Sequence, residues 1–328
     1  MKLLDENYLG ICIPTYNREK YLAECINSIL SGVSQFSFPI YISDNASSDN
    51  TEELMERFRA TYNRIEYNRN KSNLGLYRNI LNVIKMAKTK YIWIVGDDDA
   101  AQENALIEIV RHLENGHDFL VLNSTPYDNK LEKYKARKFI PCKFDKLYPK
   151  SFSRELLGDL KKNAYHGFIS SMVIKTEFIQ KLIPKYENPT FVLYNNIWFP
   201  TALFYEAILE KSGMFVCEPL IKNRANLRPS DKDFWNYLYV DHIKAVDYLR
   251  DVGYDNKFLR RAIDSNLLSM LYIMVNAKFL HRNIYLLNRF LTKTPILPIR
   301  TKLLILSIDS IPFFILKRIR NILWRNKS

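Results

Sequence analysis

The sequence predicts an α/β protein with a mostly parallel sheet and helices on both of its faces. Over the first 125 residues, short apolar runs rich in β-branched and aromatic residues alternate with segments whose apolar residues recur at helical spacing. The runs lack the polar alternation of strands with one exposed face. Such a succession of strand and helix is typical of parallel strands joined by right-handed crossovers. The 328 residues, 47% of them hydrophobic, suffice for a large core.

Each expected element of this first part has a local signal. Pro14 ends the first strand, and Asn17 stands where it can cap the helix that follows. Asp49 and Glu52 have capping-box spacing at the start of the next helix. The expected strands cover residues 8–13, 39–43, 65–67, 91–95 and 119–122, and the expected helices begin near Asn17, Asp49, Leu76 and Asn104.

The pattern changes beyond about residue 125. Residues 126–150 mix proline, lysine and aromatic residues, which indicates an irregular connection. We expect a strand over 168–174, a short helix capped by Thr176 and an edge strand near 214–220.

A helical pattern runs throughout the segment from Phe234 to about Leu291. We therefore place a domain boundary before this segment. The predicted first domain covers residues 1–228, with halves at 1–125 and 126–228, and a helical C-terminal region covers 229–328.

The cysteines and the N-terminal segment indicate a cytoplasmic protein. Four cysteines, Cys12, Cys25, Cys142 and Cys217, are widely spaced, without a CxxC motif or a Cys/His cluster. We interpret them as small hydrophobic residues in a reducing compartment and not as a disulfide framework. The first residues lack the apolar core of a signal peptide.

The positive charge is concentrated at the C-terminus. From Lys278 onward, eleven Lys/Arg residues face a single acid, Asp309, which accounts for +10 of the net charge of +13. Over 296–324 these cations accompany apolar stretches, as in a basic amphipathic helix that lies on an anionic membrane surface. The alternative is a helix docked on the body of the protein. A basic nucleic-acid-binding domain is disfavoured, because it spreads charge over a folded face.

Three consecutive aspartates, Asp97, Asp98 and Asp99, follow the apolar run 91–95 and Gly96. Carboxylates at the end of a buried strand repel one another unless a cation or hydrogen-bond donors offset the charge. Hard oxygen ligands at this density suit Mn²⁺ or Mg²⁺, which share their remaining positions with substrate phosphates. A solvated acidic turn is the alternative.

Four polar loops follow the carboxyl ends of four expected strands and are predicted to meet in one crevice. Backbone N–H groups and an arginine there can hold phosphate, and a carboxylate can bind a base or ribose. The first strand lacks the GxGxxG turn of a dinucleotide-binding fold. The loops read IPTYN, SDNASSDNT, NLGLYRNILN and GDDDA.

This set of loops resembles family 2 glycosyltransferases of the GT-A fold, collinearly over about residues 8–124. The resemblance implies an inverting, metal-dependent enzyme that uses a nucleotide-diphosphate sugar, most often a UDP-sugar. It implies the following donor-binding residues: Pro14, Thr15, Tyr16, Asn17, Asp44, Gly75, Arg78 and Asp97. Gly96 stands where the family's first aspartate falls, so the resemblance places the metal on Asp98 or Asp99 and gives Asp97 the sugar or ribose.

An inverting transfer needs a general base for the acceptor hydroxyl. The family supplies an aspartate late in the catalytic domain, whereas this chain has Asn195 and Asn196 in the corresponding region. Amide side chains cannot accept the proton. The catalytic residue is therefore unknown, and the nearest candidates are His166, Glu187, Asp231 and Asp233.

The sequence and the resemblance thus predict a glycosyltransferase at the inner face of the plasma membrane that adds a sugar to a growing surface glycan. The expected acceptor is a lipid-linked glycan (capsule, O-antigen or lipooligosaccharide). Two alternatives stay open. One is a catalytically silent nucleotide-sugar-binding scaffold at the membrane, which the two asparagines keep in play. The other is a nucleic-acid-binding protein that uses the basic tail.

Overall fold

A computed structural model describes residues 6–32, 37–132, 138–160, 167–224 and 234–263 of the chain. The chain forms two compact units. The segments Arg154–His166 and Asn196–Trp198 belong with the C-terminal residues, although they precede residue 228. Unit 1 comprises Met1–Ser153, Gly167–Asn195 and Phe199–Arg228, and unit 2 comprises Arg154–His166, Asn196–Trp198 and Pro229–Ser328.

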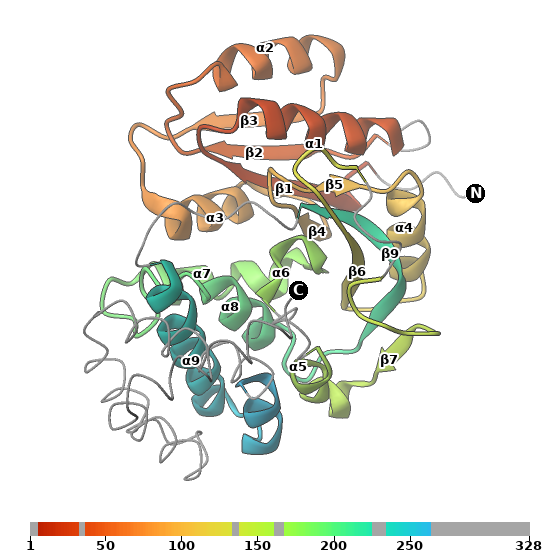
Figure 1. Ribbon diagram of the computed structural model, residues 1–328, viewed down its shortest axis with the longest axis vertical. Helices are drawn as coiled ribbons and strands as arrows, with labels where there is room; N and C mark the ends of the chain where they lie inside the picture. Colours follow the sequence, from red (N-terminus) through yellow and green to blue (C-terminus); the bar gives the residue numbers. More distant parts are fainter. Residues whose placement is uncertain (1–5, 33–36, 133–137, 161–166, 225–233, 264–328) are drawn as a thin grey trace, which may run out of the picture. The chain divides into compact units, whose positions relative to one another are not determined.

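Unit 1 is built on one mixed sheet (Figure 1). In the described part of the chain it has nine strands, in the order β3-β2-β1-β4-β8-β6-β9-β5, and β7 also pairs with β9. The strands are β1 (Leu9–Thr15), β2 (Ile40–Asp44), β3 (Ile65–Arg69), β4 (Tyr91–Ile94), β5 (Ala100–Ala101), β6 (Phe119–Tyr127), β7 (Lys146–Tyr148), β8 (Met172–Lys175) and β9 (Gly213–Arg224).

The α/β fold class is confirmed, and the sheet contains antiparallel pairings besides the parallel ones. Strands β3, β2, β1 and β4 pair in parallel, as predicted for the first 125 residues. Strand β8 then inserts antiparallel between β4 and β6. The expected edge strand near 214–220 is wrong: β9 lies between β6 on one side and β5 and β7 on the other.

Helices cover both faces of the sheet (Figure 1). Alternate residues of β1, Leu9, Ile11 and Ile13, join one buried cluster with residues of α1, α2 and α4. Helix α3 packs against β1 and β2 through its own apolar residues, such as Ile80 and Ile84. The helices of unit 1 are α1 (Glu19–Gly32), α2 (Thr51–Thr61), α3 (Gly75–Met86), α4 (Ala105–Glu114), α6 (Thr176–Gln180), α7 (Ile183–Glu187) and α8 (Phe199–Ala207).

Two of the expected helix caps are wrong in detail. The side-chain oxygen of Asn17 accepts the N–H of Ser48 in the second loop at 2.7 Å and does not cap α1. Asp49 instead serves both helices: its Oδ2 accepts the N–H of Glu19 at 3.0 Å, and its Oδ1 accepts the N–H of Thr51 at 3.2 Å. One carboxylate therefore satisfies the N-terminal donors of α1 and α2, which ties the first two loops together.

The cysteines behave in two ways. Cys12 and Cys25 are unpaired and buried, as predicted. Cys142 and Cys217 form a disulfide, so the interpretation of these two as isolated hydrophobic residues is wrong. Their separation of 75 residues hid the pairing, since the sequence does not show that the connection after β6 returns to β9.

The described residues of unit 2 include α5 (Glu155–Asp159) and α9 (Phe234–Val252). Ile243, Val246 and Leu249 recur at helical spacing on α9 and are buried, in agreement with the helical pattern predicted for this segment. Within the described residues, no helix has the length and apolarity to cross a bilayer. The basic tail over 296–324 lies outside the described residues.

Candidate active site

The four predicted loops lie together at the carboxyl ends of β1 to β4, and side-chain hydrogen bonds join them. Asn17 of the first loop binds Ser48 of the second at 2.7 Å. The amide of Asn45 in the second loop donates to Asn73 Oδ1 in the third at 2.7 Å. Thr15 of the first loop donates its hydroxyl to Asp97 at 2.8 Å. The predicted convergence of the loops is therefore what the structure shows.

Asn79, which the sequence did not single out, anchors α3 beneath these loops. Its side-chain amide is buried and donates to the carbonyls of Thr15 at 3.1 Å and Ser43 at 3.0 Å, at the ends of β1 and β2. Its Oδ1 accepts the Ser43 hydroxyl at 2.7 Å and the Asn70 amide at 3.0 Å. All of its polar capacity is used within the protein, so Asn79 positions the site without facing a ligand.

Asp97 is buried between two donors. Its Oδ2 accepts the Thr15 hydroxyl, and its Oδ1 lies 3.0 Å from Nη1 of Arg18. Burial raises the pKa of Asp97 to about 6, the Arg18 guanidinium opposes this rise, and Asp98 adds to it. The negative charge at this corner is therefore not fully compensated by the protein.

Asp98 shares the same guanidinium nitrogen. Its Oδ2 also lies 3.0 Å from Nη1 of Arg18, and its side chain is 23% exposed. A single cationic group thus bridges two neighbouring carboxylates. Arg18 directly follows the IPTYN loop in the sequence, but nothing in the pattern indicated that it reaches the aspartates 79 residues away.

Asp99 faces the interior and both of its oxygens are occupied. Oδ2 accepts the Ser170 hydroxyl at 2.5 Å, and Oδ1 accepts the backbone N–H of Arg224 at 3.0 Å and the Asn223 amide at 3.3 Å. Ser170 also accepts the N–H of Gly96 at 2.9 Å. Burial raises the pKa of Asp99 to about 7, and Asp98 adds to the rise. Asp99 therefore holds the aspartate loop against β9 and against the short helix (Ile169–Ser171) that precedes β8.

Arg224 is a buried clamp on the same loop. Its Nε donates to the backbone carbonyl of Asp98 at 2.8 Å, and its guanidinium pairs with Glu24 on α1 and lies 4.7 Å from the Tyr21 ring centre. It also donates to the carbonyl of Asn129. Arg224 is buried at the end of β9, so its guanidinium is occupied by contacts within the protein.

Asp44 is fully buried and saturated by its neighbours. Its Oδ1 accepts the N–H and hydroxyl of Ser47 at 2.9 and 2.5 Å, and its Oδ2 accepts the Tyr67 hydroxyl at 2.8 Å. The structure thus shows it ordering the second loop. Its predicted contact with the nucleotide stays a prediction.

The remaining predicted residues differ in accessibility. Pro14 and Thr15 are buried, Asn17 binds the second loop, and Tyr16 is 42% exposed at the end of β1. Gly75 begins α3 with φ of +80°, a conformation that disfavours a side chain, and nothing lies within 4 Å of a Cβ built there. Arg78 is exposed, donates to the Tyr194 hydroxyl and lies 5.4 Å from that ring's centre.

The candidates for a general base do not gather in a described site. Glu187 is exposed and pairs with Lys85 at 2.5 Å. Within unit 2, Asn196 donates to the backbone carbonyl of Asp241 at 3.0 Å, and the Asp241 carboxylate accepts the N–H of Ile197 at 3.2 Å. Burial raises the pKa of Asp241, and the Ile197 N–H opposes the rise. His166, Asp231 and Asp233 lie outside the described residues.

The carboxylates of Asp97, Asp98 and Asp99 differ in how well they fit a divalent cation. No group of three or more His, Cys, Asp or Glu side chains with a metal-binding arrangement occurs in the part of the chain that the structure describes. Asp98 is nevertheless partly exposed, and both it and Asp97 direct an oxygen at one positive centre, the Arg18 nitrogen. The donor chemistry suits Mn²⁺ or Mg²⁺ at Asp98, whereas Asp99 has no oxygen without a donor.

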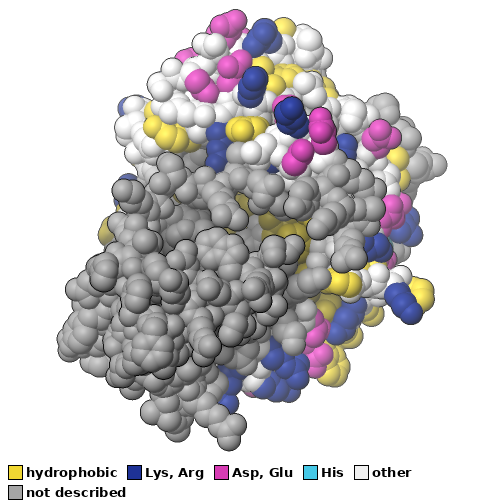
Figure 2. All heavy atoms as spheres, viewed as in Figure 1, with side chains coloured by type: hydrophobic (Ala, Val, Ile, Leu, Met, Phe, Trp, Pro, Cys, Tyr) yellow, Lys and Arg dark blue, Asp and Glu magenta, His cyan; other side chains and the backbone are white. Residues whose placement is uncertain are grey.

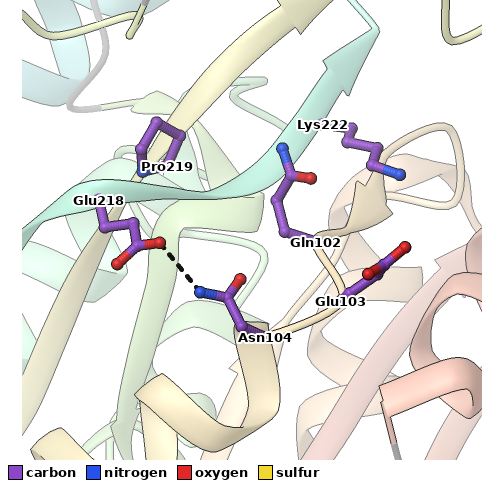
Figure 3. A pocket seen from close by; sticks show the side chains of 6 residues that line it. All are labelled: Gln102, Glu103, Asn104, Glu218, Pro219 and Lys222. Atoms are coloured by element: carbon purple, nitrogen blue, oxygen red, sulfur yellow. Dashed lines mark hydrogen bonds between the residues drawn. The ribbon is translucent and has the colours of Figure 1, made fainter.

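A separate pocket of about 440 Å³ lies between the start of α4 and β9 (Figure 3). The Asn104 amide and the Glu218 carboxylate point toward one another across it and form a hydrogen bond of 2.9 Å. It has no aromatic side chain on which a base can stack and shares no residue with the four loops, so it is not the candidate donor site. It is lined by Gln102, Glu103, Asn104, Glu218, Pro219 and Lys222.

Solved structures share this fold. TarS of Staphylococcus aureus (residues 1–349), in complex with UDP-GlcNAc, superposes with a TM-score of 0.63 at 15% identity, covering 98% of this chain and 92% of that one. The mannosyltransferase PcManGT from Pyrobaculum calidifontis, in complex with GDP-Man and Mn²⁺, superposes with a TM-score of 0.54 at 12% identity, covering 97% and 88%. These likenesses confirm the predicted GT-A fold.

Sequence comparison gives the family. The model of glycosyl transferase family 2 matches residues 10–196, so this chain belongs to that family of glycosyl-transferring enzymes. Abequosyltransferase RfbV of Salmonella typhimurium is 43% identical over 113 residues, 34% of each chain. TarS, a poly(ribitol-phosphate) β-N-acetylglucosaminyltransferase, is 26% identical over 116 residues, 34% of this chain and 20% of its own. The chain thus spans about a third or less of the length of these two relatives.

Proposed function

We propose that this protein transfers a glycosyl group from a nucleotide-diphosphate sugar, with a UDP-sugar as the first choice, to a hydroxyl of a growing surface glycan. The observation that carries the proposal is the junction of Thr15, Arg18, Asp97 and Asp98, which gathers two carboxylates and a guanidinium where four strand ends meet. The names of RfbV and TarS support a surface glycan as acceptor. The UDP and UDP-GlcNAc complexes of TarS support the donor.

Donor binding divides among the loops. Tyr16 offers an exposed aromatic face for the base, and Asp97 accepts hydrogen bonds from ribose or sugar hydroxyls. Gly75 leaves room for the diphosphate, and Arg78 pairs with it after leaving Tyr194. Asp44, buried with its oxygens occupied, contributes to the nucleotide contact by ordering the second loop.

Asp98 is the residue that we assign to a divalent cation. When bound there, Mn²⁺ or Mg²⁺ neutralises negative charge that develops on the leaving diphosphate. Arg18 must release Asp98 for the carboxylate to become a ligand, and its guanidinium is then free to bind phosphate oxygens. Asp99 and Arg224 keep the loop in place during this exchange.

We propose that the acceptor hydroxyl attacks the anomeric carbon from the face opposite the leaving diphosphate, which inverts that centre. Glu187 is a poor general base in the described structure because it is paired with Lys85. One observation favours the alternative of a catalytically silent scaffold. The Asn196 side chain is hydrogen-bonded within unit 2, and its amide cannot act as a general base.

A thermal-shift screen of UDP- and GDP-sugars, each with and without Mn²⁺, tests donor and metal together. We expect a rise in midpoint with one UDP-sugar that depends on Mn²⁺. An unchanged midpoint with every donor contradicts the proposal. Release of UDP in the presence of acceptor extract separates the enzyme from the silent scaffold, which binds the donor without turnover.

We also propose that the basic C-terminal tail attaches the protein to the inner face of the plasma membrane, near a lipid-linked acceptor. Deletion of residues 313–328 is expected to move the protein from the membrane fraction to the supernatant after cell lysis. An unchanged distribution contradicts this role. Loss of DNA retention in the same deletion, with liposome binding intact, favours the nucleic-acid alternative.

A further inference from the structure

A short segment around β7 exposes large apolar side chains. Phe144 is 83% exposed, Leu147 is 52% exposed and Phe152 is 51% exposed. Three exposed lysines alternate with them along the chain. Large apolar side chains that crowd one exposed segment mark an interaction surface more often than isolated ones do. We call these exposed residues of one chain segment the β7 patch: Lys143, Phe144, Lys146, Leu147, Lys150 and Phe152.

The β7 patch is held on a firm base within unit 1. Tyr148 is buried and lies opposite Gly213 of β9, where a Cβ would come within 2.5 Å of the Phe119 ring. The Cys142–Cys217 disulfide joins the start of the segment to β9, and the N–H of Cys217 donates to Asp145 Oδ1 at 2.8 Å. The exposed side chains are therefore presented by an anchored strand.

The sequence segment that contains the patch carries an excess of positive charge. Residues 126–150 contain eight Lys/Arg and three Asp/Glu, an excess separate from that of the C-terminal tail. The acid inside the patch, Asp145, is engaged by the Cys217 N–H and lies 3.5 Å from His112. Figure 2 shows basic, hydrophobic and some acidic side chains next to one another at the lower right, where Figure 1 places β7.

Protection of a sheet edge does not account for this composition. Lysines on an edge strand prevent pairing with another chain. Phe144 and Leu147 have the opposite effect, because exposed apolar residues on an edge invite association. The composition therefore indicates a partner surface that contacts apolar side chains and also binds the ammonium groups of lysines.

We propose that the β7 patch docks on an anionic lipid–water interface. Phenylalanine and leucine side chains fit the boundary between headgroups and acyl chains, and lysine stems lie along it while the ammonium groups reach lipid phosphates. Stable attachment to a membrane takes two signals, and the patch supplies one besides the basic tail. The inference concerns how the protein lies on the membrane, and it does not depend on the donor chemistry.

A fluorescent probe in the patch tests the insertion directly. An environment-sensitive dye is attached to the full chain through Phe152→Cys, and, as a control, through Glu56→Cys on α2, an exposed position outside the patch. With phosphatidylcholine vesicles that contain phosphatidylglycerol, we expect emission from position 152 to rise and shift to the blue while position 56 is unchanged. If the vesicles bind the protein without a change at position 152, the proposal is wrong.

Variants of the full chain then separate the contribution of charge to vesicle binding from that of the apolar side chains. The variant K143Q/K146Q/K150Q is expected to weaken vesicle binding about tenfold or more, since each lysine near an anionic surface contributes about a fivefold change. The variant F144S/L147S is expected to weaken it at unchanged charge. K88Q/K181Q/K257Q, which loses the same three charges at exposed positions, is expected to bind as the unaltered chain does.

Two results contradict the proposal. One is equal loss of binding in the patch and control lysine variants, which indicates that net charge alone drives binding. The other is conversion of a dimer to a monomer by F144S/L147S, measured by light scattering without vesicles, which indicates that a second copy of the chain covers the patch. Unchanged thermal midpoints show that the variants are folded, as expected for exposed side chains.

Discussion

The two halves of unit 1 are held together by different contacts. In the part that precedes β6, parallel strands follow one another through helical crossovers, and Asn79 ties α3 to the ends of β1 and β2. From β6 to β9, strands pair across long sequence separations, and Asn123 on β6 donates to the carbonyls of Ile140 and Cys217. The first network places the donor-site side chains, and the second fixes the connection that leads to the β7 patch. Each part thus depends on a buried asparagine. Asn79 supports the candidate donor site, and Asn123 supports the connection that leads to the β7 patch.

The sharpest expected contrast is between two adjacent aspartates. Asp98→Asn is expected to reduce Mn²⁺-dependent donor affinity by at least about 100-fold, because it removes the accessible ligand, while the thermal midpoint changes little. Asp99→Ala is expected to lower the free energy of unfolding by about 2–4 kcal/mol, because it leaves buried donors unpaired. Calorimetric titration and urea unfolding measure the two effects. The reverse pattern would place the metal on Asp99.

Asn79 and Asn123 provide the next test. Asn79→Ala and Asn123→Ala are each expected to cost about 2–3 kcal/mol of stability, since both leave buried groups without partners. Donor affinity should fall in the first variant. Hydrogen exchange should rise over residues 138–148 in the second, with the donor loops unaffected. Equal effects of both variants on donor affinity would show that the two halves are not independent.

Arg18→Ala tests whether the guanidinium competes with a divalent cation. We expect Mn²⁺ to bind about tenfold more tightly to the variant without donor, because the side chain that now pairs with both carboxylates is gone. Donor affinity with Mn²⁺ should fall. Electron paramagnetic resonance of free Mn²⁺ gives the first quantity. Weaker Mn²⁺ binding in Arg18→Ala would mean that Arg18 organises the site and does not compete for it.

The smallest effect is a pH dependence of stability without divalent cations. The pKa of Asp97 is raised to about 6 and that of Asp99 to about 7 in the folded protein, from 3.8. The folded state therefore holds these protons more tightly, and this contribution to stability is lost as pH rises from about 4 to about 7. Asp97→Asn is expected to flatten the decline by on the order of 1–2 kcal/mol. If the stability of Asp97→Asn declines equally steeply with pH, Asp97 does not hold its proton more tightly in the folded state.

Local signals predicted the donor half well because each element there depends on its own residues. The apolar run 91–95 and the apolar stripe of α3 were visible in the sequence. The succession of strands and helices indicated parallel pairing. The roles of Arg18, Ser170 and Arg224 were not visible, because their partners lie 71 to 200 residues away. The position of β9 and the disulfide were missed for the same reason.

The sequence by itself determined the class of fold, the family and the loops that form the candidate site, because hydrophobic periodicity and polar strand ends are properties of short segments. The tertiary structure decided the separate roles of the three aspartates. Their sequence context is nearly identical, but one is buried against Thr15, one stays partly exposed, and one is saturated by β9 and Ser170. Burial and hydrogen-bond partners distinguish them, and both depend on contacts between residues far apart in the chain.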